Sequence, residues 1–408
     1  MQIYVVQPQD TVDSIAAEFG LDVYALVFYN QLIYPYELAV GQALLLPDGQ
    51  AETDGAGETG ESGEAEISSQ PEKSVCVSGY AYPFISPWVL SQTLPYLAEL
   101  PIFSYGFSEE GELYAPNPSA DWMIEAARGA SVAPILTLTP LGIDGRFNNN
   151  LIHSVVNSDV YTERLIQNVV NEMQEKGYQG VNIDFEYILP EDRDLFTAFV
   201  REMGEAVRAA GYHISIALAP KTSADQKGLL YEGKDYGALG AVTDHVLLMT
   251  YEWGYTYGPP MAVAPINQVR RVVEYARTEI PAEKIDLGIP NYGYDWPLPY
   301  ERGVTKATTI GNVQAVRIAI ANGATITFDP VAMSPYFQYY DEETGQAHEV
   351  WFEDVRSLQA KFDLIRDYGL RGCGYWQIMQ WYRANWLLLA ENFTLSPFLY
   401  CSAATPLL

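Results

Sequence analysis

The sequence predicts an α/β protein whose body is a (β/α)8 barrel, the TIM barrel, preceded by a small βααβ module. From about residue 75 onward, apolar runs of strand length alternate with amphipathic stretches of helix length. This alternation is typical of a parallel sheet covered by helices. A polar segment rich in Gly and Glu, residues 50–74, separates a short head from this body. With 408 residues, of which 48% are hydrophobic, the chain can form more than one domain.

The head, residues 1–49, is predicted to fold as strand, helix, helix, strand. IYVVQ has the character of a strand, and Asp10 or Thr11 can cap a helix that ends at Gly20. Asp22 can cap the second helix, and ALLLP closes the module as a strand. A segment this short, without a metal or a disulfide, is marginal for independent folding. The following residues, 50–74, have little to bury and are predicted to be an extended linker.

The body, residues 75–400, is predicted to supply the barrel. Eight strands are expected near residues 78–84, 100–107, 132–139, 180–187, 213–220, 245–253, 284–294 and 372–379. Helical stretches that end in glycine lie between them. The interval between the last two strands is too long for one helix. Its part from about 297 to 350 is expected to form a small α+β insertion between strands seven and eight.

The charge of the chain bears on its partners. The formal net charge of −29 argues against nucleic acid and against anionic membrane surfaces, which repel an acidic protein. The start, MQIYVVQPQD, lacks the basic and apolar regions of a secretory signal. No apolar run approaches the ~20 residues that a membrane span needs. We therefore expect a neutral or weakly charged substrate, no nucleic acid and no membrane, and interpret the acidity as an aid to solubility.

Cysteine and histidine content indicates neither a disulfide framework nor a metal centre. The three cysteines, Cys76, Cys373 and Cys401, are odd in number and widely spaced. The four histidines also stand far apart, and each is interpreted as structural or exposed. Cys373 is expected to act as a small buried apolar residue. The sequence thus predicts no metal and no cofactor.

The stretch GVNIDFEY, residues 180–187, is the most informative. Side chains alternate along a strand, so Asn182, Asp184 and Glu186 should share one face. Buried carboxylates are costly unless they are paired or used, and no basic residue lies nearby in the sequence. Carboxyls about 6 to 7 Å apart along a strand can share a proton, as a general acid requires. We interpret Asp184 and Glu186 as catalytic, with a buried ion cluster as the structural alternative.

Two parts of the chain resemble known families. The pieces YVVQPQDTVDSIAAEFGL, FYNQL and GQALLLP of the head resemble a LysM module, which implies binding of glycans that contain N-acetylglucosamine. In the body, QGVNIDFE resembles the DGxDxDxE signature of family-18 glycoside hydrolases, the chitinase family. MTYEW, GIPNYGYDW and GYWQ agree with that family at three later strands. Four motifs at strand ends are far more specific than one.

The resemblance implies substrate-assisted hydrolysis that retains the anomeric configuration. In that scheme Glu186 protonates the glycosidic oxygen, and the 2-acetamido oxygen of the sugar attacks its own anomeric carbon. Asp184 orients the acetamido N–H and stabilises the oxazolinium-like intermediate, while Tyr251 hydrogen-bonds the acetamido oxygen. Trp376 forms the floor of the sugar pocket, and Glu186 later activates water.

Further substrate-binding residues are expected at the strand ends. Tyr292 and Tyr80 are candidates for sugar contact, because an aromatic ring can cover the apolar face of a pyranose. Asn291 is a candidate hydrogen-bonding group beside them, and Asn182 and Trp253 complete the set. For each of these aromatic residues, packing in the core is an equal alternative.

The chain departs from the signature at two positions, because Gln179 and Asn182 stand where it has aspartate. Asn182 can hydrogen-bond Asp184 but cannot share its charge, so we expect less upward coupling of the Asp184 pKa than in a three-aspartate chitinase. Glu252 follows Tyr251 where chitinases usually have aspartate. With the LysM-like head, these departures resemble the spore cortex hydrolases of the YaaH/SleL type, which are N-acetylglucosaminidases.

The resemblance therefore implies a peptidoglycan N-acetylglucosaminidase of the spore cortex that cleaves β-1,4 bonds and binds glycan through its head. Cleavage should follow N-acetylglucosamine, because a muramic δ-lactam has its nitrogen locked in a ring. A chitinase or chitooligosaccharidase is the alternative. A non-catalytic glycan-binding coat or wall protein is a further one, against which Glu186 argues. We expect a monomer that is spore-associated or otherwise cytoplasmic.

Overall fold

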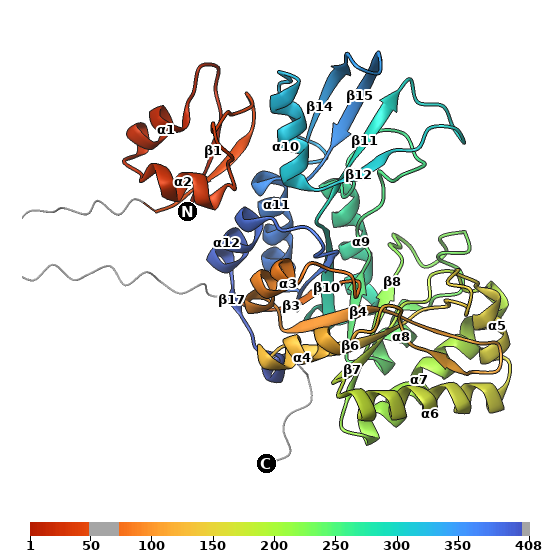
Figure 1. The fold of residues 1–408 in the computed structure, drawn as a ribbon. Helices are drawn as coiled ribbons and strands as arrows, with labels where there is room; N and C mark the ends of the chain where they lie inside the picture. Colours follow the sequence, from red (N-terminus) through yellow and green to blue (C-terminus); the bar gives the residue numbers. More distant parts are fainter. Residues whose placement is uncertain (49–72, 402–408) are drawn as a thin grey trace, which may run out of the picture.

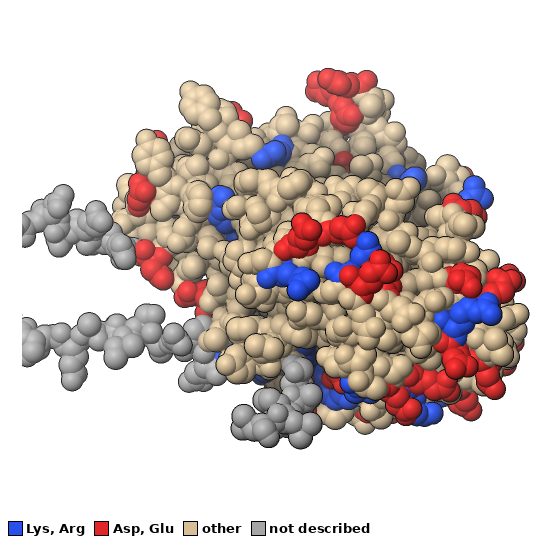
Figure 2. All heavy atoms as spheres, turned by 60° about the horizontal axis from the view of Figure 1, so that its bottom comes forward, with Lys and Arg blue, Asp and Glu red and all other residues tan. Residues whose placement is uncertain are grey.

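The computed structural model describes residues 1–48 and 73–401. The predicted linker, apart from residues 73 and 74, lies outside the described residues. Figure 1 shows the head, a barrel surrounded by helices, and a smaller sheet with one helix beside the head. Among the described helices, none combines the length and the apolar character that crossing a membrane would require. Figure 2 shows one face of the molecule, where Asp and Glu side chains gather in patches with Lys and Arg among them.

The head has the predicted order of elements: β1 (Gln2–Val5), α1 (Val12–Phe19), α2 (Val23–Tyr29) and β2 (Ala43–Leu46). The two strands pair antiparallel. Thr11 caps α1 in a reciprocal hydrogen-bonded box with Ser14, and Gly20 ends the helix at a φ of 62°. The Asp22 carboxylate accepts two backbone N–H groups at the start of α2. The predicted helix caps are therefore confirmed.

Eight strands of the described body form a closed parallel barrel, which confirms the predicted fold class. They are β3 (Ser74–Gly79), β4 (Glu99–Phe107), β6 (Ala133–Leu138), β7 (Gly180–Ile183), β8 (His213–Leu218), β9 (His245–Leu248), β10 (Ile285–Pro290) and β16 (Gly372–Trp376). The last strand pairs with the first, which closes the barrel. The covering helices include α3 (Pro87–Thr93), α4 (Asp121–Gly129), α6 (Asp159–Lys176), α7 (Arg193–Ala209), α8 (Tyr236–Val242), α9 (Ile266–Glu279), α11 (Val355–Asp367) and α12 (Arg383–Asn392).

The fourth barrel strand is shorter than predicted. Its pairing with β8 ends at Ile183, so Asp184 and Glu186 follow the strand instead of lying within it. The Asp184 N–H nevertheless donates to the Leu138 carbonyl of β6 at 3.0 Å. The alternation of side chains therefore continues one residue beyond the strand, and Asp184 shares the inner face with Asn182.

The predicted α+β insertion lies between β10 and β16. Its elements are β11 (Gly293–Leu298), β12 (Thr308–Ile310), α10 (Asn312–Ala321), β13 (Thr327–Asp329), β14 (Ser334–Asp341) and β15 (Gln346–Trp351). The strands form one antiparallel sheet in the order β12-β11-β15-β14-β13. The head contacts this insertion, because the Ile326 N–H donates to the Val40 carbonyl at 2.8 Å. Gly41 allows this close approach, since a Cβ there would lie 1.8 Å from the Ile326 carbonyl oxygen.

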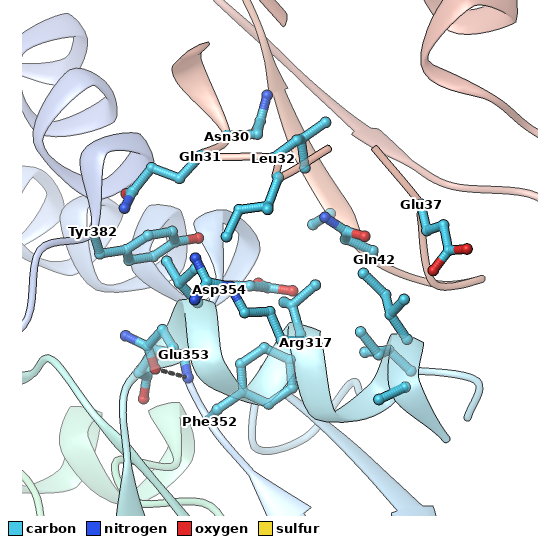
Figure 3. A pocket seen from close by; sticks show the side chains of 18 of the residues that line it. Asn30, Gln31, Leu32, Glu37, Gln42, Arg317, Phe352, Glu353, Asp354 and Tyr382 are labelled. Atoms are coloured by element: carbon cyan, nitrogen blue, oxygen red, sulfur yellow. Dashed lines mark hydrogen bonds between the residues drawn. The ribbon is translucent and has the colours of Figure 1, made fainter. Parts of the chain in front are cut away.

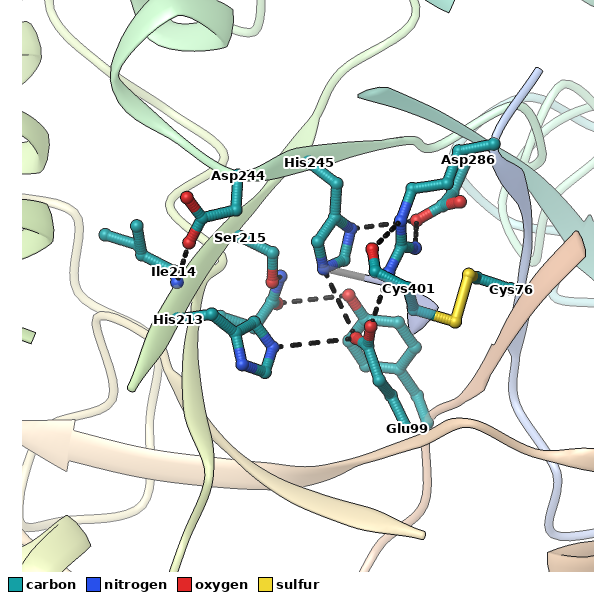
Figure 4. Close-up of polar contacts among 12 residues, drawn as sticks. Cys76, Glu99, His213, Ile214, Ser215, Asp244, His245, Asp286 and Cys401 are labelled. Atoms are coloured by element: carbon teal, nitrogen blue, oxygen red, sulfur yellow. Dashed lines mark hydrogen bonds and ion pairs between the residues drawn. A yellow bond between two sulfur atoms is a disulfide. The ribbon is translucent and has the colours of Figure 1, made fainter. Parts of the chain in front are cut away.

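Charged side chains close the amino end of the barrel (Figure 4). Arg371 donates to Glu99 and to Asp286, each at 2.6 Å. The His245 ring lies between the same carboxylates, with Nε2 3.3 Å from Glu99 and Nδ1 2.8 Å from Asp286. His213 lies 4.0 Å from Glu99. Two histidines that are far apart in the sequence thus meet one carboxylate, closely enough to hold a metal ion.

We interpret this cluster as an ion network that stabilises the base of the barrel. Burial alone would raise the pKa of Glu99, but the charges of His245 and Arg371 hold it well below its usual value. Both carboxylates already have cationic partners, which leaves little negative charge for a metal ion to neutralise. The amino end of a TIM barrel is also the end where such residues contribute to stability.

A disulfide joins Cys76 of β3 to Cys401 near the end of the described chain, with an S–S distance of 2.10 Å. The prediction from cysteine spacing was wrong, because the two residues are 325 positions apart and only barrel closure brings them together. Cys373 is buried and unpaired, as predicted. The bond ties the first barrel strand to the segment that crosses the base.

The variant Cys401→Ser should be less stable than the oxidised wild type by about 2–4 kcal/mol, because a cross-link over a long loop restricts the unfolded chain. Denaturant unfolding with and without a reducing agent measures this. Reduction should bring the wild type close to the variant. Equal stability of the variant and the oxidised wild type would contradict the assigned role.

Candidate active site

Two carboxyl groups stand at the carboxyl end of β7. Asp184 is 8% exposed, and its Oδ1 is buried without a hydrogen-bond partner among the described atoms. Glu186, two residues later, is exposed to solvent. Burial, together with the charge of Glu186, raises the pKa of Asp184 to about 7. A carboxyl that titrates near neutral pH beside an exposed one can share a single proton with it.

Asn182 lies one step deeper on the same face, and both ends of its side-chain amide form hydrogen bonds. The Tyr80 hydroxyl donates to Asn182 Oδ1 at 3.1 Å, and Asn182 Nδ2 donates to Ser215 Oγ at 2.9 Å. The expected hydrogen bond to Asp184 is not formed, and the amide bonds Tyr80 and Ser215 instead. Asn182 therefore positions Tyr80, and both side chains lie beneath the carboxyl pair.

Lys234 is a buried cation beside the carboxyl pair that the sequence did not reveal. It is fully buried, and its ammonium donates to the backbone carbonyl of Glu186 at 2.7 Å. The nearby Lys221 donates to the Lys234 carbonyl at 3.0 Å and fixes the backbone there. Burial lowers the pKa of Lys234 to about 8, against the charges of Glu186 and Asp184. Its charge in turn lowers the pKa of Asp184.

No basic residue lies near the carboxyls in the sequence, but the fold brings a distant one to them. Lys234 lies 48 residues beyond Glu186, in the segment before α8, and its side chain reaches the site only after the barrel has closed. A single lysine in a polar stretch carries no sequence signal of burial. The position becomes recognisable as unusual only in the structure, where the lysine is buried without a salt bridge to a carboxylate.

Tyr251 follows β9 and is buried beside the carboxyl pair. Burial, and then the neighbouring Tyr80, Asp184 and Glu186, raise its pKa well above the usual value. Its ring fits because Gly288 of β10 has no side chain: a Cβ there would lie 2.8 Å from a ring carbon of Tyr251. The phenol thus stays protonated and can donate a hydrogen bond.

Trp376 ends β16 and is held by edge contacts to other aromatic rings. Its ring centroid lies 5.0 Å from that of Phe103, 5.9 Å from Tyr80 and 6.0 Å from Tyr82, all at steep angles. The indole is only partly buried. Its packing fixes the orientation of the ring at the same end of the barrel as the carboxyl pair.

Tyr292 is buried, and its hydroxyl donates to the carboxylate of Glu252. Tyr294 donates to the same carboxylate at 2.9 and 3.1 Å. Burial raises the pKa of Glu252 although both hydrogen bonds oppose the shift. Glu252 itself has a φ of 66°, a conformation that side chains other than glycine rarely adopt. The candidate Tyr292 is therefore committed to positioning Glu252, which also acts electrostatically with Glu186.

Two candidates stand apart from this group. The side chain of Asn291 donates to the carbonyls of Gln377 at 3.2 Å and Gln380 at 2.8 Å, so it shapes the loop after β16. No hydrogen bond or ring contact in the described part of the chain joins the Trp253 ring to the carboxyl pair. The structure thus brings together the two carboxyls, Asn182, Tyr80, Tyr251 and Trp376.

Comparison with known proteins agrees with this geometry. The model of glycosyl hydrolases family 18 matches residues 141–380, and that of the LysM domain matches residues 4–47. The chain belongs to family 18 of the glycosyl hydrolases. The resemblances of the body and the head are both confirmed, and the head is a LysM domain.

Relatives in this family match nearly the whole chain. The cortical fragment-lytic enzyme of Bacillus subtilis is 38% identical, over 96% of this chain and 98% of that protein. The structure of the Bacillus megaterium spore cortex-lytic enzyme SleL has a TM-score of 0.88 and 34% identity, and the match covers 97% of this chain and 98% of that one. A Chromobacterium violaceum chitinase, at 24% identity and a TM-score of 0.71, shares the fold.

Removing the Lys234 charge should raise the pH at which Asp184 titrates, because the ammonium favours the ionised carboxylate. Carboxyl 13C NMR of Lys234→Met across pH 5 to 9 measures this midpoint. Lys361→Met is the matched control, since Lys361 is equally buried but pairs with Glu353 at 2.8 Å. The same midpoint in Lys234→Met and the wild type would refute the assigned electrostatic role.

Proposed function

We propose that this protein is a spore cortex N-acetylglucosaminidase that hydrolyses β-1,4 bonds after N-acetylglucosamine in peptidoglycan fragments. The observation that supports it best is the carboxyl pair Asp184 and Glu186 in a family-18 chain. The relatives that match its full length are named cortical fragment-lytic and spore cortex-lytic enzymes. We extend that activity to this chain and assign the roles below to its own residues.

The proposed reaction proceeds in two displacements. Glu186, exposed at the end of β7, donates its proton to the glycosidic oxygen as the bond breaks. The 2-acetamido oxygen of the sugar attacks the anomeric carbon, so the substrate supplies its own nucleophile. Asp184, as a carboxylate, accepts the acetamido N–H and balances the positive charge of the oxazolinium ring. Water activated by Glu186 then attacks the anomeric carbon from the face that the leaving group occupied. This second displacement opens the oxazolinium ring and retains the configuration.

The surrounding residues fit these roles. The Tyr251 phenol is held in its donor form and is proposed to hydrogen-bond the acetamido oxygen. Trp376 is proposed to lie beneath the sugar ring, and Asn182 supports Tyr80 below it. Lys234 limits how far the pKa of Asp184 rises, so the carboxylate form remains accessible. Trp253 is retained as a candidate for sugar contact, whereas the buried Asn291 and Tyr292 are proposed to act through the loop after β16 and through Glu252.

The partner proposed for the whole chain is a glycan that contains N-acetylglucosamine, bound by the LysM domain and cleaved by the barrel. We propose that residues 1–49 form the LysM domain, 50–74 the linker and 75–400 the catalytic domain, with its insertion at about 297–350. The named relatives support a location at the spore. A monomer is the proposed state.

Glu186→Gln should lower cleavage of purified cortex fragments by about 100- to 10,000-fold, because an amide cannot serve as the general acid or base. Mass analysis of the products should show new reducing ends that are N-acetylglucosamine. The control is Glu191→Gln, which changes an exposed glutamate five residues away.

Digestion of vegetative peptidoglycan and chitin oligomers in parallel separates the alternatives. Cleavage of chitin oligomers alone would identify a chitinase instead. Glycan binding without any turnover that depends on Glu186 would identify a binding protein.

The rate of the chemical step should fall as the pH rises through about 7. The pair must hold one proton for Glu186 to act as an acid, and the shared proton is lost in the range where Asp184 titrates. Single-turnover rates on cortex fragments from pH 5 to 9 measure this limb. A rate that stays constant from pH 6 to 9 would show that the shared proton is not required.

A further inference from the structure

The LysM domain is held against the barrel by contacts on α2. Arg383, at the start of α12, donates through its guanidinium to the Phe28 carbonyl at 2.8 Å and lies 3.7 Å from the centre of the Phe28 ring. Gln31 accepts the backbone N–H of Arg383 and donates to the Trp381 carbonyl at 3.3 Å. These contacts and the Ile326–Val40 hydrogen bond fix the domain from two sides.

Beside these contacts the two domains leave a groove of about 760 Å³ open between them. We call it the seam groove. Its LysM wall is the outer face of α2, where Tyr24 is 77% and Phe28 56% exposed. Its barrel wall contains Trp88, which is 54% exposed and packs edge-on against Trp381 at 6.1 Å. Aromatic rings this exposed, from both domains, form a surface suited to the apolar faces of sugars.

A smaller pocket of about 270 Å³ continues from the groove, between the loop after α2 and helix α10 of the insertion (Figure 3). Gln31, Leu32 and Arg317 line both spaces, which shows that they adjoin. The pocket is also lined by Gln42 and by three acids, Glu37, Glu353 and Asp354. Glu353 pairs with Lys361 and Asp354 with Arg356, which leaves Glu37 as the acid without a cationic partner in the described chain. The combined site is long, aromatic in one part and polar in the other, as an extended glycan requires.

The seam groove is positively charged, whereas the molecule as a whole is strongly negative. The chain has a formal charge of −29, yet the residues that line the seam groove include Arg317 and Arg383 and neither Asp nor Glu. Arg317 is exposed and makes no hydrogen bond or ion pair with another described residue. The acids of the combined site all line the adjoining pocket, so the cations dominate the seam groove alone. There they favour an anionic ligand, and arginine binds carboxylates with paired N–H groups.

We propose that the seam groove, formed by the LysM domain and the barrel together, binds a peptidoglycan strand through sugar stacking and through a carboxylate of its muramyl peptides. This proposal rests on the proposed function for the class of substrate. The barrel residues of the groove come after β3 and β16 in the chain, at the carboxyl end of the barrel, where Asp184 and Glu186 also lie. A strand held there extends toward the catalytic end of the barrel.

The carboxylate gives the groove a selectivity that the catalytic centre does not have. A muramic δ-lactam has lost its lactyl carboxylate and chitin has none. Unsubstituted muramic acid keeps its lactyl carboxylate, and a muramyl peptide carries the carboxylates of its peptide. The groove should therefore prefer strands that still carry muramic acid. It would hold the enzyme on less modified stretches of glycan while the barrel cleaves nearby.

Calorimetric titration of the full chain in a Glu186→Gln background tests the proposal without turnover. The probes are purified glycan strands that carry muramyl peptides, and N-acetylglucosamine hexamers as a neutral ligand. Arg317→Glu should raise Kd for the muramyl strands about tenfold at low salt and leave the hexamer unchanged, because one charge pair is reversed. Trp88→Ala should raise Kd for both ligands.

Arg302→Glu and Tyr340→Ala, which change exposed residues outside the groove, are the matched controls and should bind as the parent does. Unchanged Kd values in Arg317→Glu and Trp88→Ala would overturn the site. An effect of Trp88→Ala alone would overturn the carboxylate selectivity. Cleavage of cortex fragments by the wild type, measured in parallel, is independent: its absence would overturn the proposed function and not the groove.

Discussion

The arrangement at the carboxyl end of the barrel depends on one buried carboxyl group whose negative charge is only partly balanced by a cation. Asp184 is taken out of water by the closure of the barrel, and its Oδ1 finds no hydrogen-bond donor among the described atoms. Such burial is costly, and the protein offsets it with the charge of Lys234 and with protonation near neutral pH. Asn182, Tyr80 and Tyr251 then pack around the carboxyl as neutral groups.

Buried acids are compensated differently at the two ends of the barrel. At the amino end, Glu99 and Asp286 share Arg371 and His245 at short distances, so their negative charge is neutralised. At the carboxyl end, the lysine bonds a backbone carbonyl and leaves the carboxyl of Asp184 free to change its charge. A paired network contributes to stability, whereas an unpaired buried group with a shifted pKa is typical of a functional site.

The sequence predicted the features that depend on local patterns. The eight barrel strands, the caps at Thr11, Gly20 and Asp22, and the shared face of Asn182 and Asp184 all follow from side-chain spacing. Features that depend on distant parts of the chain were missed. Lys234, the disulfide of Cys76 with Cys401, and the meeting of His213 with His245 each require the closed barrel. Asn182 shows the same limit, since its face was predicted but its partners were not.

The configuration of the first product is the most direct test of substrate-assisted catalysis by the carboxyl pair. Proton NMR of cortex fragments during the first turnovers distinguishes the α from the β anomer at the new N-acetylglucosamine end. The account predicts that the β anomer forms first and that fragments whose acetamido group has been converted to an amine are not cleaved. The α anomer as first product, or cleavage of the amine fragments at the normal rate, would contradict it.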